Sequence, residues 1–162
     1  MINIEELVAI IESSEWCEKL KAADILAEHG SSEVVASLIA LLKSKDGKVR
    51  NASTLALREI GDDIAVEPLF AAIHDPANVE NRSTLVYALE TLDCSGHFID
   101  VVKLAVFGKA DVQMSALVIL AEQGFYMDDD DLAEALFMLE KAKELSIDYA
   151  LLKSLLNELG EE

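Results

Sequence analysis

The sequence repeats itself every 31 or 32 residues, and this period constrains the fold more than any other feature. Residues 49–69, moved back by 31 positions, align with residues 18–38, with leucine on leucine and glycine on glycine. Moved forward by 32 positions the same segment aligns with residues 81–101, and a further 31 positions reach residues 112–132. The four segments align without internal gaps. A period of this length is typical of repeat proteins, in which each repeat buries its apolar face against its neighbours.

Each repeat is predicted to contain two helices, because its apolar residues recur three or four positions apart. The predicted ends of the first helices fall in one column of the alignment, in which a left-handed residue is expected. The members of this column are Gly30, Gly61, Asp93 and Gly124. Residues 31–33, 61–63 and 128–131 offer side-chain oxygens that can cap helix starts. Pro68 fits only a first helical turn, so its helix should begin near Ala65.

These signals predict an all-α protein of ten helices. The predicted helices cover residues 4–12, 15–29, 33–44, 47–60, 65–74, 79–92, 96–107, 110–123, 129–144 and 147–159. We expect a single domain that forms a right-handed α-α superhelix, a solenoid of four to five helical hairpins. Its expected parts are a leading cap (1–14), repeats 15–45, 46–76, 77–108 and 109–145, and a C-terminal cap (146–162).

The second repeat resembles the HEAT-like repeats first named from the bilin lyases of phycobilisomes. The residues that carry this resemblance are Asp46, Val49, Arg50, Ala52, Leu57, Ile60, Gly61, Asp62, Ala65, Val66 and Leu69. The third repeat departs from the pattern at Asn81, Thr84 and Asp93, and the fourth has Gln113 in place of the arginine. The resemblance implies an α-solenoid. It also implies an alternative function, that of a bilin lyase or a lyase accessory subunit.

The charge of the chain favours some partners over others. The chain has 31 acidic residues and 13 lysines and arginines, a formal net charge of −18. Such a surface repels nucleic acid and anionic lipid, and the basic residues look scattered along the sequence. Basic proteins would be attracted to it. The acidity has a second interpretation, in which it only keeps an apolar-rich chain in solution.

The sequence predicts a cytoplasmic protein. Its two cysteines, Cys17 and Cys94, suggest no disulfide framework, and its first residues are acidic where a signal peptide would be basic. No apolar run approaches the length of a membrane span.

We find no combination of residues that predicts catalysis, and we expect no cofactor. Cys94, His97 and His29 could ligate a metal, but a structural zinc needs four ligands, so we interpret them as ordinary loop residues. The four aspartates 128–131 lack the alternating spacing of a calcium loop and are expected to cap a helix. Phe125 and Tyr126 are adjacent in a predicted turn, where one of them should be exposed.

We therefore predict a non-catalytic protein-binding module whose acidic surface binds a basic partner protein. The protein could act as an inhibitor or an immunity-type protein against a basic toxin or nuclease. We expect contacts from the flank of the second helix of each repeat. The predicted contact residues are Glu67, His74, Lys103, Asp130, Glu134 and Phe137, with Ala71 beside them.

Overall fold

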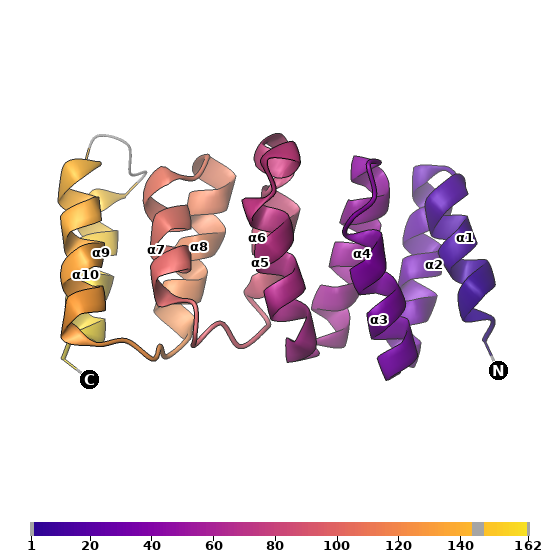
Figure 1. Ribbon diagram of the computed structural model, residues 1–162, viewed down its shortest axis with the longest axis horizontal. Coiled ribbons are helices and arrows are strands. Elements are labelled where there is room, and N and C mark those ends of the chain that lie inside the picture. The colour runs from indigo at the N-terminus through magenta and orange to yellow at the C-terminus, as the bar shows by residue number, and fades with distance from the viewer. Residues whose placement is uncertain (1, 144–147, 162) are drawn as a thin grey trace. The chain divides into compact units, whose positions relative to one another are not determined.

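The computed structural model describes residues 2–143 and 148–161, and all regular structure in these residues is helical (Figure 1). The described α helices are α1 (Ile4–Ser13), α2 (Trp16–His29), α3 (Ser32–Leu41), α4 (Gly47–Ile60), α5 (Val66–His74), α6 (Ser83–Leu89), α7 (Phe98–Phe107), α8 (Ala110–Glu122), α9 (Asp129–Lys141) and α10 (Tyr149–Leu159). Two 3-10 helices, η1 (Asp63–Ala65) and η2 (Pro76–Asn81), precede α5 and α6. The predicted α-solenoid of helical hairpins is confirmed.

The chain divides into two compact units, Met1–Leu92 (unit 1) and Asp93–Glu162 (unit 2). In unit 1 the helices pack as antiparallel neighbours α1 with α2, α3 with α4 and α5 with α6, and α4 also packs against α2 and α6. In unit 2, α7 packs against α8 and α9, and α10 packs against α9 and α8. The predicted repeats begin one helix later than these pairs, and their boundaries stay a prediction.

The columns of the repeat form the cores of the two units. The leucine column, Leu26, Leu57, Leu89 and Leu120, is at most 1% exposed. The same is true of a column from the following helices, Leu38, Leu69 and Val101. Fully burying a leucine contributes about 1.5–3 kcal/mol relative to leaving it exposed, so these columns supply much of the stabilisation of each unit.

A polar column has an equally regular role. Its members Lys19, Arg50, Arg82 and Gln113 stand at equivalent positions of the four repeats. Each donates a side-chain hydrogen bond to a carbonyl at or shortly after the end of the preceding odd-numbered helix. The acceptors are the oxygens of Ile11, Ser44, Ile73 and Val106. Carbonyls at and beyond a helix end lack partners within the helix, so this column satisfies one such carbonyl in each repeat.

The prediction of a helix over 79–92 is wrong. The chain instead forms η2 and then the seven-residue α6, which ends at Leu89. Helical structure begins at Pro76, before the predicted start at residue 79. The reason is that Asp75 caps η2 by accepting a hydrogen bond from the main-chain N–H of Ala77, and Pro76 occupies the first helical position. The amide of Asn78 then donates to the carbonyl oxygen of Ala72 at 2.8 Å, which fastens η2 to the end of α5.

The predicted column of left-handed helix ends is half right. Gly30 and Gly61 end α2 and α4 with φ of 57° and 69°. The prediction is wrong for Asp93, which lies beyond the end of α6, and for Gly124, which follows an extended Gln123. In unit 2 the side chain of Gln123 accepts the main-chain N–H of Cys94 at 2.9 Å, which holds the chain extended at this point. Pro68 does lie in the first turn of α5, as predicted.

The predicted ends at 144 and 147 lie outside the described residues. Within the described ranges, no helix combines the length and the apolar composition needed to cross a membrane.

Candidate protein-binding surfaces

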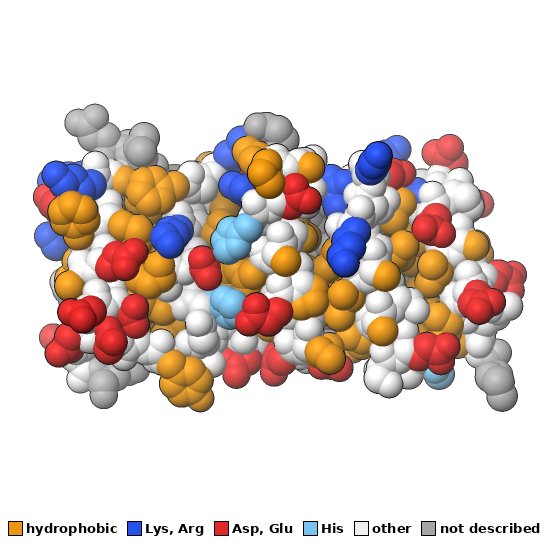
Figure 2. Space-filling model, viewed as in Figure 1, with side chains coloured by type: hydrophobic (Ala, Val, Ile, Leu, Met, Phe, Trp, Pro, Cys, Tyr) orange, Lys and Arg blue, Asp and Glu red, His pale blue; other side chains and the backbone are white. Residues whose placement is uncertain are grey.

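Unit 1 carries a local group of basic residues at one of its edges. Successive helices run in opposite directions, so the turns between them alternate between two edges of the unit. The turns after α2 and α4 form an acidic edge with exposed Glu33, Asp62 and Asp63. Lys43 and Lys45 lie between α3 and α4, and Lys48 and Arg50 lie in the first turn of α4; together they form a basic group at the other edge, which we call the basic edge. Figure 2 shows a group of Lys and Arg side chains toward the upper edge of this unit, with Asp and Glu beside them there and along the lower edge.

The aspartates 128–131 cap α9 as predicted. The Asp128 carboxylate accepts hydrogen bonds from the main-chain N–H groups of Asp130 and Asp131, and Asp131 accepts from the main-chain N–H of Asp128. This reciprocal arrangement satisfies unpaired donors, and the negative charge is favourable at this end of the helix dipole. The aspartates therefore have a structural role that requires no calcium.

Two carboxylates of unit 2 have pKa values shifted by hydrogen bonds. The side chain and the main chain of Ser95 hold the pKa of Asp93 below its ordinary value. A hydrogen bond from the hydroxyl of Tyr149 lowers the pKa of Glu140, with a smaller contribution from Lys143 and Lys153. Both carboxylates are exposed, and both shifts favour the charged form, so neither group resembles a general acid or base.

Cys94 and His97, considered above as metal ligands and interpreted as ordinary loop residues, and the two turn aromatics have simple structural roles. Cys94 is fully buried, and His97 Nδ1 lies 3.5 Å from the carboxylate of Asp100. Among the described residues no group of three histidines, cysteines or carboxylates could hold a metal ion. Phe125 packs against Phe98 with ring centroids 5.6 Å apart, whereas the side chain of Tyr126 is 81% exposed. One aromatic residue of this turn is therefore exposed, as expected.

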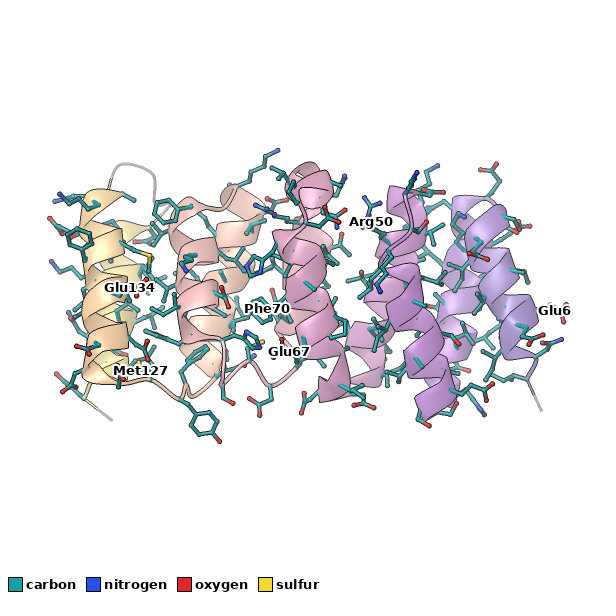
Figure 3. The ribbon with its side chains drawn as sticks, viewed as in Figure 1. Glu6, Arg50, Glu67, Phe70, Met127 and Glu134 are labelled. Carbon is teal, nitrogen blue, oxygen red and sulfur yellow. The ribbon has the colours of Figure 1, made fainter. Side chains whose placement is uncertain are left out.

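The predicted contact residues fall into two groups, one in each unit. Glu67, Ala71 and His74 are exposed along α5 in unit 1, and the His74 ring lies 6.2 Å from that of Phe70. In unit 2, Lys103 is exposed on α7, and the remaining three are exposed on α9: Asp130, Glu134 and Phe137. Figure 3 labels Glu67 and Glu134, one in each unit. Ala71 lies on α5 beside the predicted contact residues of unit 1, and the contact of the six predicted residues with a partner stays a prediction.

A groove lies between α3 and α5 in unit 1. One hollow, of about 690 Å³, has mainly apolar walls, to which Ile39, Leu42, Pro68, Ala71 and Ala72 contribute. A second hollow, of about 750 Å³, adjoins it at the basic edge, where Lys43, Lys45, Lys48 and Arg50 line it. The two hollows share four lining residues: Leu42, Lys43, Asp75 and Asn78. We call the two hollows together the α3–α5 groove.

The sequence analysis missed this groove and wrongly treated the basic residues as scattered. Four of the 13 lysines and arginines lie within residues 43–50 and line one hollow. The run KSKDGKVR at residues 43–50 was a visible signal, but only Asp46, Val49 and Arg50 in it were considered, as members of the repeat pattern. Glu67 and Ala71 do line the groove, whereas His74 does not.

The helical hairpins, the stacked cores and the grooves on their sides define an α-solenoid. The chain belongs to the HEAT-repeat family, because the family model for HEAT repeats matches residues 4–90, more than half of the 162 residues. HEAT repeats generally mediate protein–protein interactions. None of the curated proteins compared with this chain matches it. The matched model describes HEAT repeats as a class, so the resemblance to the bilin-lyase type stays a prediction.

Proposed function

We propose that this chain is a non-catalytic protein-binding module whose acidic surface binds a basic partner protein. The observation that carries the proposal is the exposed face of α9. Asp130, Glu134 and Phe137 recur on it at helical spacing, and the Phe137 side chain is 63% exposed. An exposed aromatic ring among charged side chains is the composition of a protein interface, in which aromatics contribute area and charges contribute orientation.

The electrostatics support a basic partner. Unit 2 adds the aspartates 128–131 at the start of α9, and the whole chain carries a net charge of −18. A field of this sign attracts a positively charged protein from a distance and raises its association rate, an effect that salt weakens. Lys141 Nζ lies 5.3 Å from the centre of the Phe137 ring, so the face also contains a cation that would limit how a basic partner can orient.

One form of this proposal makes the protein an inhibitor or immunity-type protein. A partner of this kind would be a basic toxin or nuclease, and the small, strongly acidic chain would cover its active surface. The net charge of −18 supports this form. It predicts that a recovered partner loses its own activity when the purified chain is added in equal amount.

A matched pair of variants tests the proposal. Asp130→Asn/Glu134→Gln and the control Glu6→Gln/Glu12→Gln change the net charge equally, and all four side chains are exposed. Proteins retained from native lysate by the unmodified chain are identified, and the affinity of each purified candidate is then measured by calorimetry at low and high salt. We expect a basic partner whose Kd rises about tenfold or more in the α9 variant and changes little in the control.

Two results would overturn the proposal. A partner with an acidic or neutral surface, bound with the same Kd by both variants, would show that the α9 face is not the interface. An equal loss of affinity in both variants would show that only the total charge matters, as expected of non-specific attraction.

A further inference from the structure

The α3–α5 groove has two chemically different regions. Its apolar region is open because the residues of α5 that face it are small: Pro68, Ala71 and Ala72. Ala71 is exposed, and Ile39 of α3 borders the same hollow. A hollow of about 690 Å³ lies within the size range of sites that hold a small ligand or a few side chains of a bound segment.

The basic region contains three lysines whose amino groups make no ion pair with the carboxylates that the structure describes. Lys43, Lys45 and Lys48 are exposed and line the basic hollow. Among the residues that the structure describes, no carboxylate lies within ion-pair distance, 4 Å, of their amino groups. Their mutual repulsion disfavours the arrangement, particularly in a chain with so few basic residues.

The other charged groups of this hollow are already engaged. Arg50 is buried and donates to the carbonyl oxygen of Ser44 at 2.7 Å. Asp46 accepts from the main-chain N–H of Lys48 at 2.8 Å and lies 3.9 Å from Lys19 Nζ. Asp75 accepts from the main-chain N–H of Ala77 at 2.8 Å. The two carboxylates cap helices, so the three lysines are the groups left to meet a ligand.

The far end of the groove has the opposite charge. Glu67 lines the apolar hollow and precedes Ala71 by a single helical turn, and Figure 3 shows Glu67 and Arg50 toward opposite ends of unit 1. A nucleic acid has a negatively charged backbone, so a groove that binds it needs positive side chains along its whole length. This groove instead has lysines at one end, apolar side chains in the middle and a glutamate at the other end, all within the length of one helix. That order suits a polypeptide segment, because side chains of different types succeed one another along it.

We propose that the α3–α5 groove binds a segment of a partner protein in which apolar residues adjoin a cluster of carboxylates. The apolar side chains lie against Pro68 and Ala71, and the carboxylates pair with Lys43, Lys45 and Lys48. This site is separate from the α9 face, takes a ligand of opposite charge, and does not depend on the function proposed above. It gives the protein a second binding surface.

Selection from a random twelve-residue peptide library displayed on phage tests this proposal. The immobilised chain is the target, and the variant Lys43→Gln/Lys45→Gln/Lys48→Gln is used for counter-selection. We expect the enriched peptides to contain apolar residues adjacent to at least two Asp or Glu, in either order along the peptide. As synthetic fluorescent peptides, they should bind the unmodified chain and lose about tenfold or more in affinity against the triple variant. Higher salt should weaken their binding.

Two further variants separate this groove from general charge effects. Ala71→Trp fills the apolar region from an exposed position and should weaken the same peptides without unfolding the chain. The control Lys21→Gln/Lys109→Gln/Lys153→Gln removes three exposed cations elsewhere and should leave their binding unchanged. Circular dichroism confirms that each variant is folded.

Three results would overturn the proposal. The enriched peptides could lack acidic clusters, or they could bind the groove variants and the unmodified chain equally. A fluorescent oligothymidylate of twelve nucleotides could bind the lysine end while the acidic peptides do not, which would indicate nucleic acid in place of protein.

Discussion

The guanidinium of Arg50 donates a hydrogen bond of 2.7 Å to the main-chain carbonyl of Ser44 and thereby fastens the turn after α3 to the first turn of α4. The same relationship recurs between Lys19 and Ile11, between Arg82 and Ile73, and between Gln113 and Val106. The side chain at this position therefore joins each odd-numbered helix to the even-numbered helix that follows it. Glutamine can replace arginine here because its amide also donates.

We predict that Arg50→Met destabilises unit 1. The substitution keeps most of the buried aliphatic volume but leaves the Ser44 carbonyl without its donor, at a cost of about 1–3 kcal/mol. Urea unfolding followed by the fluorescence of Trp16, the single tryptophan of the chain, measures the loss in this unit. Lys45→Met, an exposed neighbour, is the control and should change stability by less than about 0.5 kcal/mol. Equal stability of the two variants would show that the hydrogen bond contributes nothing.

We predict that Gly61→Ala is destabilising and that Gly124→Ala is not. Gly61 has φ of 69°, and a side chain in this left-handed conformation costs about 1–2 kcal/mol. Gly124 is not left-handed, and in both places an added Cβ would meet no atom within 4 Å. The backbone conformation is therefore the difference between them. Urea unfolding monitored by circular dichroism should show a lower midpoint for Gly61→Ala alone, and a similar loss in both variants would contradict the assignment.

We predict that Asp128→Ala loosens α9 more than Asp129→Ala does. Asp128 accepts two main-chain N–H groups, and loss of such a cap costs about 0.5–2 kcal/mol. Asp129 makes only the favourable interaction with the helix dipole, which contributes about 0.3–1 kcal/mol. Hydrogen exchange of the amides in the first turn of α9 measures the difference. Faster exchange in Asp129→Ala than in Asp128→Ala would contradict the capping role.

The regular portion of this fold could be predicted because each aligned position of the repeat has the same structural role in successive repeats. Leucines such as Leu26 and Leu57 are buried in every copy, and Gly30 and Gly61 end helices that the structure also ends there. The predictions failed where the third repeat departs from the pattern, around Asn81 and Asp93. There α6 shortens, and the boundary between the two units follows after Leu92.

The groove could not be predicted from the same columns. Helical periodicity identifies which side chains face a core, but the room left between α3 and α5 depends on how far apart two helices lie, and that distance is not encoded in a single repeat. The apolar region depends on small residues such as Ala71, which resemble ordinary helix surface in the sequence. The lysine end depends on turns from two repeats, around Lys45 and Asn78, that only the folded chain brings together.

Finally, we predict that Ser95→Ala raises the pKa of Asp93 toward its ordinary value. The hydroxyl and the main-chain N–H of Ser95 both favour the charged carboxylate, and the substitution removes only the hydroxyl. Because the pKa is lowered in the folded chain, this interaction stabilises the fold at pH values above the ordinary pKa of aspartate. The contribution is lost as the pH falls through the lowered value. Carbon-detected NMR titration of the Asp93 carboxyl gives both pKa values, with Asp129, which is also exposed, as an internal reference. An unchanged Asp93 pKa in Ser95→Ala would assign the shift to the main-chain N–H alone.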